Sequence, residues 1–192
     1  MADWMDISRT IRRGMPVYSP EERFECLRQK RLERDGYNLS YISMGCHCGT
    51  HMDAPAHFLS NGAAIDAVSP EVLMGRVRIS TLRSESELPD FHGAKRLILR
   101  MHTLGLNQTQ ARDIAESGVM LLGVSGMSVA AGENEAAVHR ILLSNGVWIL
   151  ENLNLDAVPD GEYEMVCAPL NLEGLEAAPA RVFVRRTGKG IF

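Results

Sequence analysis

Apolar and polar residues follow one another along the chain in patterns that predict a mixture of strands and helices. Residues 38–44 alternate between polar and apolar side chains up to Gly45, which is typical of a half-buried strand. Continuous apolar runs at residues 119–124 and 147–150 favour buried strands. Further strand-like runs occupy residues 77–81, 96–101, 163–168 and 181–184.

Helices are expected between several of these strands. Each expected helix has residues at its ends that are typical of helix termini. The expected helices are a short turn from Ser69 to Gly75, residues 109–116 and residues 133–144. The order strand, helix, strand across residues 119–150 predicts a local α/β unit. The many strands elsewhere favour mixed sheets with flanking helices over a doubly wound sheet, still within the α/β class.

Size and composition are those of an ordinary globular protein. The chain has 192 residues, 45% hydrophobic and 23% charged, so we expect one domain across residues 1–192. The net charge of −4 argues against nucleic-acid binding, which usually requires a basic surface. No apolar run approaches the roughly 20 residues of a membrane-spanning helix. The acidic first residues do not resemble a secretory signal, so we expect a cytoplasmic protein with no membrane partner.

One short segment concentrates residues of the kinds that bind metal ions. Three of the six histidines fall within eleven residues, and an aspartate lies among them: His47, His51, Asp53 and His57. All four positions are odd-numbered, and alternate residues of an extended backbone share a face. Two imidazoles and a carboxylate are a ligand set for Zn, Mn or Fe(II), because near pH 7 histidine can be neutral while aspartate is ionised.

The backbone of this segment is expected to be a strand that bends into a loop. Gly49 weakens a helix, and Pro55 disfavours helical conformation in the residue before it. Two alternatives stay open at this point. The histidines could make ordinary hydrogen bonds, or a structural zinc site could use Cys46 and Cys48, although a regular strand directs those cysteines to the opposite face.

A second pair of polar residues lies further along the chain. His139 falls in the expected helix 133–144, and Glu151 follows a strand that is expected to be buried. The carboxyl ends of strands are where α/β folds tend to place ligands, and a buried glutamate needs a partner. Taken alone, His139 is more simply explained as a packed helix residue, and Glu151 as a solvated acid at the end of a strand.

The segment 47–58 resembles the signature of the cyclase family, the metal-dependent hydrolases that include bacterial kynurenine formamidases. That signature is His-x-Gly-Thr-His-x-Asp-x-Pro-x-His-Phe, and eight specified positions match: His47, Gly49, Thr50, His51, Asp53, Pro55, His57 and Phe58. Residues 137–140 and 150–153 resemble the family's second metal segment. Residues 6–18 and 169–181 resemble its opening and its C-terminal segment.

The resemblance implies roles for these residues. It implies two ions of Zn or Mn, with a shared aspartate between them: His47, His51 and Asp53 would bind the first ion, and Asp53, His139 and Glu151 the second. His57 would be the general acid and base, and Tyr18 would contact the substrate. The spacing of twelve residues between His139 and Glu151 matches that of the formamidases.

The resemblance also implies a fold and a reaction. The fold would be the swivelling β/β/α type, assembled as a homodimer or a larger homo-oligomer. The reaction would be hydrolysis by a metal-activated water of a small amide, either an aryl formamide such as N-formylkynurenine or an isatin-like lactam. Tyr37 and Tyr41 are expected to add aromatic walls beside Tyr18.

Two segments depart from the family pattern. Ser19-Pro20-Glu21 stands where Pro-Gly-Asp is usual, and Ser125-Gly126-Met127-Ser128 stands where Asp-x-Pro-Ser is usual. The metal chemistry is therefore better defined than the substrate. Two rival functions remain: a non-haem Fe(II) oxygenase, which would leave the second pair and His57 without a shared role, and a non-catalytic metal-binding protein that has kept the fold.

Overall fold

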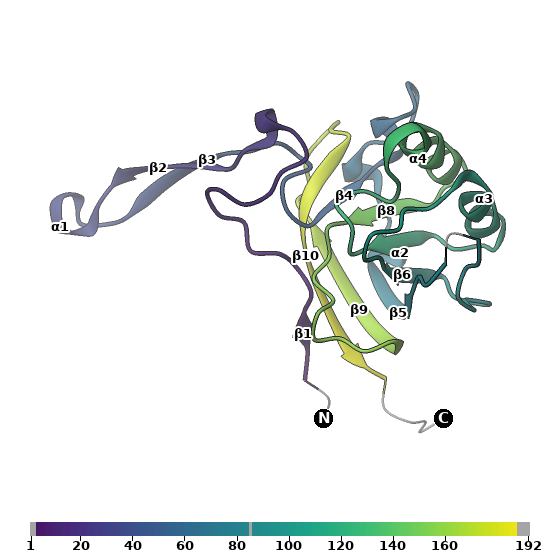
Figure 1. The fold of residues 1–192 in the computed structure, drawn as a ribbon. Coiled ribbons are helices and arrows are strands. Elements are labelled where there is room, and N and C mark those ends of the chain that lie inside the picture. The colour runs from purple at the N-terminus through teal and green to yellow at the C-terminus, as the bar shows by residue number, and fades with distance from the viewer. Residues whose placement is uncertain (1–2, 85, 188–192) are drawn as a thin grey trace.

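The computed structural model describes residues 3–84 and 86–187, and it consists of a strand barrel, helices on one side of it and a projecting hairpin (Figure 1). The strands of the main sheet are β1 (Met5–Asp6), β4 (His51–Asp53), β5 (Met74–Thr81), β6 (Arg96–Arg100), β7 (Leu121–Val124), β8 (Trp148–Glu151), β9 (Gly161–Pro169) and β10 (Ala177–Arg186). The hairpin contains β2 (Glu25–Lys30), α1 (Leu32–Asp35) and β3 (Leu39–Ser43). The other helices and 3₁₀ turns are η1 (Pro20–Glu22), η2 (Pro55–His57), η3 (Ile65–Ala67), α2 (Pro70–Leu73), α3 (Gln108–Glu116), η4 (Gly132–Asn134) and α4 (Glu135–Ser144).

Seven strands of the main sheet close into a barrel. Their order is β10-β4-β8-β7-β6-β5-β9, and pairing between β9 and β10 completes the ring, while β1 pairs with β10 at its edge. Strands β5 to β8 run parallel, and every other neighbouring pair is antiparallel. The prediction of a mixed α/β protein is therefore confirmed, whereas the swivelling β/β/α type stays a prediction.

Two apolar clusters lie on opposite faces of the barrel strands. On β6, Ile98 belongs to one cluster, and its neighbours Leu97 and Leu99 belong to the other. The second cluster also contains side chains from α3 and α4, including Ile114 and Leu142, so it fills the space between the helices and the outer barrel face. The first cluster consequently fills the barrel interior. Burial on both faces explains why β7 and β8 are continuous apolar runs.

The predicted elements are largely confirmed, with differences at their ends. The α/β unit of β7, α4 and β8 has the predicted order, and its two strands are parallel neighbours. Gly75 does not end the turn after Ser69, because β5 has already begun at Met74. No helix among the described residues is long and apolar enough to cross a membrane.

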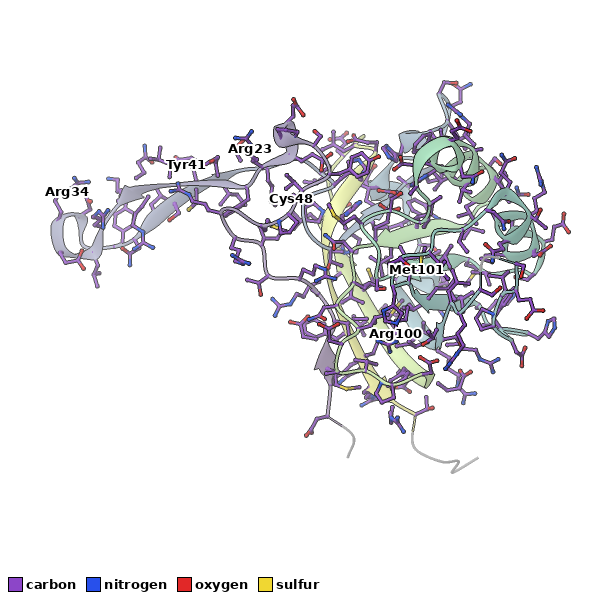
Figure 2. All side chains as sticks on the ribbon, in the orientation of Figure 1. Arg23, Arg34, Tyr41, Cys48, Arg100 and Met101 are labelled. Carbon is purple, nitrogen blue, oxygen red and sulfur yellow. The ribbon has the colours of Figure 1, made fainter. Side chains whose placement is uncertain are left out.

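Residues 23–43, which we call the arm, project away from the barrel (Figures 1 and 2). Strand β3 matches the predicted strand at residues 38–44, but its antiparallel partner β2 was not predicted. In the register of this pair Leu27 lies opposite Tyr41 on one face, and Cys26 lies opposite Ile42 on the other. Leu27, Tyr41 and Ile42 are all more than half exposed, so neither face of the arm is covered.

Candidate metal centre

Strands β4 and β8 place three polar side chains on the outer face of the barrel. His51 pairs with Glu151 and Met52 pairs with Leu150 in the register of these strands. Met52 and Leu150 both belong to the interior cluster, so the alternation of a strand directs His51, Asp53 and Glu151 outward. All three are buried there, where α4 packs against β8.

Helix α4 contributes the fourth side chain, His139. The apolar residues Val138 and Leu142 anchor the helix in the outer cluster, and His139 is buried beside them. Its Nδ1 lies 2.8 Å from the carbonyl oxygen of Glu135, one helical turn earlier. Its Nε2 faces the two carboxylates, 3.3 Å from Glu151 Oε1 and 3.7 Å from Asp53 Oδ2.

His47 and His57 reach the same place by a different route from the one predicted. The alternation argument is correct for His51 and Asp53 on β4, but it is wrong for the other two. His47 lies in a turn before β4, and His57 lies in the 3₁₀ turn η2, which begins at Pro55. Their rings nevertheless lie 4.3 Å apart between centroids, and His47 Nδ1 is 3.0 Å from Asp53 Oδ1.

The possible ligand atoms form two groups that share Asp53. One group is His47, Asp53 and His57, the other is His51, Asp53 and Glu151, and within each group the atoms lie within 4.8 Å of one another. The shared aspartate agrees with the bridging role that the resemblance implies. The rest of the grouping differs from the predicted one: His57 joins His47 as a possible ligand, and His51 groups with Glu151 instead of with His47. His139 belongs to neither group, although its Nε2 faces Asp53 and Glu151.

Several atoms at the centre of the cluster lack a hydrogen-bond partner. Asp53 is fully buried, and neither of its oxygens has a donor of acceptable geometry among the described residues. The same is true of His51 Nε2, although Glu151 Oε2 lies only 3.4 Å away. Unpaired polar atoms in the protein interior are costly and rare. A bound cation would satisfy all three, so the residues present fit a metal ion.

Charge pairing within the cluster shifts the pKa values of its members. Burial alone lowers the pKa of His51, but Glu151 and Asp53 beside it raise that pKa to about 9. Burial alone raises the pKa of Asp53, whereas His47 and His51 lower it to about 2. Burial lowers the pKa of His57, which lies further from the carboxylates. His57 is therefore more readily neutral near pH 7 than His51 or His139, whose pKa values are raised, when no metal ion is bound.

A backbone carbonyl fixes the orientation of His51. Gly49, at φ 73°, turns its carbonyl oxygen toward the imidazole, and His51 Nδ1 lies 3.0 Å from it. Asn152 Nδ2 donates to the same oxygen at 3.2 Å, and Asn152 itself has a positive φ of 59°. A proton on Nδ1 leaves the Nε2 lone pair directed at the carboxylates, as metal ligation requires.

The two cysteines that flank His47 take no part in this arrangement. Cys48 is buried with its Sγ 3.8 Å from Met15 Sδ, and burial raises the pKa of both Cys46 and Cys48. Neither belongs to a group of described residues that could hold an ion. The structural-zinc alternative is therefore not supported.

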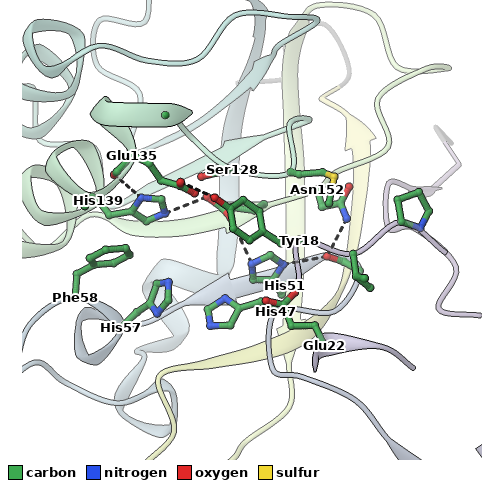
Figure 3. A pocket seen from close by; sticks show the side chains of 17 residues that line it. Tyr18, Glu22, His47, His51, His57, Phe58, Ser128, Glu135, His139 and Asn152 are labelled. Atoms are coloured by element: carbon green, nitrogen blue, oxygen red, sulfur yellow. Dashed lines mark hydrogen bonds and ion pairs between the residues drawn. The ribbon is translucent and has the colours of Figure 1, made fainter. Parts of the chain in front are cut away.

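The cluster lies at the base of a cavity of about 470 Å³. Tyr18 forms part of its wall, as predicted, and its hydroxyl donates to Glu135 Oε2 at 2.6 Å (Figure 3). Phe58 forms another part and stacks on the His139 ring, with centroids 4.6 Å apart. The expectation for Tyr37 and Tyr41 is wrong, because both lie on the arm and neither lines the cavity.

Glu135 is a cavity residue that sequence reasoning missed. It is the first residue of α4, and its contact with Tyr18 joins positions 117 residues apart. No local pattern marks such a contact. Asn152 was also missed, although an asparagine directly after a strand-end glutamate is a usable signal, since asparagine tolerates positive φ.

Comparisons with known proteins agree with this geometry. A family model described as "Putative cyclase" matches residues 5–103. A kynurenine formamidase of Bacillus cereus (strain ZK / E33L) is 32% identical over 204 residues, covering 96% of this chain and 98% of the relative.

Solved structures give the same picture. A potential metal-dependent hydrolase with cyclase activity superposes with a TM-score of 0.84 at 28% identity, covering 98% of this chain and 100% of the other. Isatin hydrolase A from Labrenzia aggregata, at 22% identity and a TM-score of 0.80, covers 97% of this chain and 94% of its own and shares the fold. The match to the family model and the full-length relative together show that this chain belongs to the cyclase family.

Proposed function

We propose that this protein is a metal-dependent hydrolase that cleaves the carbon–nitrogen bond of a small amide, with an aryl formamide as the preferred class. One observation carries the proposal: buried imidazole and carboxylate atoms without hydrogen-bond partners converge at the base of an open cavity. The kynurenine formamidase name of the relative supports the formamide class. An isatin-like lactam contains the same type of bond and is the second substrate to test.

We further propose two ions of Zn or Mn, held by His47, His51, Asp53, His139 and Glu151. Such ions act as Lewis acids toward a carbonyl oxygen and lower the pKa of a bound water from 15.7 to about 7. The second group of ligands is also what separates this proposal from a non-haem Fe(II) oxygenase. A facial triad uses three protein ligands for one iron ion, whereas this cluster contains two groups of possible ligands that share Asp53.

His57 is proposed to move the protons of the reaction. Hydrolysis adds a water oxygen to the carbonyl carbon, breaks the carbon–nitrogen bond, and transfers one proton to the leaving nitrogen. Burial lowers the pKa of His57, so it is neutral near pH 7 and can accept the proton of the water. The imidazolium can then donate to the nitrogen, which releases formate and an arylamine from an aryl formamide.

Tyr18 and Phe58 are proposed to hold the aromatic part of the substrate. Both rings line the cavity, and Tyr18 is 60% exposed, so its face is available for stacking. Stacking of this kind adds about 0.5–1.5 kcal/mol beyond the burial of area. Glu135 holds the Tyr18 hydroxyl and so limits the motion of the ring.

We also propose that the chain assembles with a second copy through the arm. A two-stranded hairpin is marginally stable when it stands alone in water, and exposed apolar patches usually mark binding surfaces. Residues 23–43 carry five basic and three acidic side chains, whereas the whole chain has 20 basic and 24 acidic ones. The basic arm therefore complements the acidic remainder of another copy. The swivelling β/β/α type and a cytoplasmic location belong to the same set of proposals.

A combined metal and activity measurement tests the function. The protein is stripped with a chelator, reloaded with Zn or Mn, and assayed for metal content and for hydrolysis of N-formylkynurenine, formanilide and isatin. We expect two ions per chain and turnover that is lost on stripping and restored on reloading. A protein that binds metal but hydrolyses no aryl formamide, lactam, imide or lactone would instead support the non-catalytic alternative.

A further inference from the structure

A second cavity, of about 430 Å³, adjoins the one above the metal centre. Pro16, Met127 and Asn152 line both, so the two cavities adjoin at these residues. Their ionisable side chains differ. Glutamates, histidines and Tyr18 line the first cavity, whereas Arg9 and Arg12 line the second.

The backbone fixes Arg9 close to the metal ligands. Its N–H donates to Thr50 Oγ1 at 2.9 Å, and its Nη2 donates to the carbonyl oxygen of Leu153 at 3.3 Å. Thr50 directly precedes His51, and Leu153 follows Glu151 by two residues. Arg9 is therefore anchored at the ends of both strands that carry the cluster.

Arg9 and Arg12 keep hydrogen-bond donors free for a ligand. Among the described residues neither forms an ion pair, and Nε and Nη1 of Arg9 have no acceptor. Arg13, by contrast, points elsewhere and pairs with Glu25 at 3.5 Å. Guanidinium groups bind carboxylates in a planar, often bidentate geometry, so two unpaired arginines in one cavity suit that group.

Ser125 leaves the positive charge of this cavity uncompensated. It lines the second cavity. Its Oγ donates to the carbonyl oxygen of Met101 and accepts the N–H of Met101, both at 2.8 Å. The hydroxyl is therefore neutral and already satisfied. A carboxylate at this position would have offset the charge of Arg9 and Arg12.

We propose that Arg9 and Arg12 form a subsite for the carboxylate of the substrate. The inference rests on the proposed function and narrows its substrate to an aryl amide that carries a carboxylate away from the scissile bond. The metal centre would attract the amide carbonyl oxygen and the two arginines would attract the carboxylate, so the two sites orient such a molecule. Its amide carbonyl lies toward the metal centre, and its carboxylate lies toward the arginines.

Matched substrates test this subsite in the metal-loaded protein. Formanilide is compared with 2-, 3- and 4-formamidobenzoate, which differ from it only by a carboxylate. We expect kcat/KM for at least one isomer to exceed that for formanilide by about tenfold or more, the effect of one charged hydrogen bond, mainly through KM. Arg9→Gln and Arg12→Gln should each reduce this preference, and Arg13→Gln should leave it unchanged.

A binding measurement separates failure of the subsite from failure of the function. Calorimetry compares the corresponding aminobenzoate with aniline in the wild type and in the Arg9→Gln/Arg12→Gln double variant. Tighter binding of the carboxylate that the double variant loses supports the subsite, even if no formamide is hydrolysed. Equal binding of the two probes, or a preference that survives in the double variant, overturns the subsite and leaves the hydrolase proposal intact.

Discussion

The cluster around β4 and the arm of β2 and β3 are both built on pairs of short antiparallel strands, yet they distribute their side chains in opposite ways. On β4 and β8 the barrel buries charged groups such as Asp53 and Glu151. On the arm, apolar groups such as Leu27 and Ile42 are exposed. Each region departs from the usual rule of burial, and each departure identifies something that the isolated chain does not contain. In the cluster the component that we propose is a cation, and on the arm it is the surface of another copy of the chain.

Replacement of the shared aspartate gives the largest expected effect. Asp53→Asn should abolish binding of both ions and reduce kcat by more than about 10³-fold, because it removes the one ligand common to the two groups. Metal analysis and turnover of formanilide measure this. The exposed Asp156→Asn is the matched control.

Thermal unfolding shows whether the variant is merely misfolded. The wild type should gain stability from added Zn or Mn, since an ion that binds only the folded state stabilises it. A folded Asp53→Asn protein should show no such gain. A folded Asp53→Asn protein that still binds two ions would contradict the role of Asp53 as the shared ligand.

His57→Ala distinguishes the two roles that the geometry leaves open for His57. If His57 transfers protons, the variant should keep both ions and lose about 10²–10⁴-fold in kcat. His102→Ala, an exposed histidine, should behave as the wild type. Loss of one ion in His57→Ala would assign the residue to the group of His47 and Asp53 as a ligand.

The pH dependence of metal binding should follow the raised pKa of His51. Without metal this histidine is protonated below about pH 9, and a metal ion binds only the neutral form. Affinity should therefore rise about tenfold per pH unit toward pH 9 and level off above it. Calorimetry in buffers of different ionisation enthalpy should detect release of the proton near pH 7.5. Affinity that is independent of pH between 7 and 9 would contradict the charge pairing in the cluster.

Stability of the metal-free protein should change in the opposite direction. The folded pKa of His51 lies above its ordinary value of 6.5. Its contribution to the free energy of unfolding is therefore fully present below pH 6.5 and is lost as the pH rises through about 9. Denaturant titrations of stripped protein at pH 6.5 and 9.5 measure this loss.

The smallest expected effect on catalysis comes from the arm. Leu27→Ser with Tyr41→Ser removes the apolar pair from one face, and Ser40→Ala is the control on the same hairpin. Burial of one large apolar side chain contributes about 1.5–3 kcal/mol, so the dissociation constant of the assembly should rise by tenfold or more. Sedimentation at several concentrations measures the change. A wild type that stays monomeric at every concentration would remove the second copy as the partner of the arm.

Sequence reasoning succeeded where the determinants are local. The alternation of His51 and Asp53 is a property of one strand, and the signature from residue 47 to residue 58 fits within one segment. It failed for His47 and His57, because their positions depend on a turn at Gly49 and a 3₁₀ turn after Pro55. Gly49 was used only as an argument against a helix, and the bend expected near Pro55 did not indicate where it would place His57.

Longer-range features were beyond such reasoning. The closed barrel depends on pairing between β9 and β10 and on the long span from β4 to β10, and no periodicity indicates which strands meet. Strand β2 was missed because Glu25–Lys30 contains mostly polar residues, with no face packed against a core. The contact of Tyr18 with Glu135 is set by the fold as a whole.

The pairing of β4 has a consequence for the order in which the possible ligand groups are completed during synthesis. Among the described residues, strand β4 pairs only with β8 and β10, which begin 97 and 126 residues later in the chain. At about 5–20 residues per second, the ribosome completes these partners roughly 5–25 s after β4. Throughout that interval His47, Asp53 and His57 already exist on one segment, whereas the group that needs Glu151 does not. The nascent chain therefore contains every residue of one possible ligand group before the other group is complete.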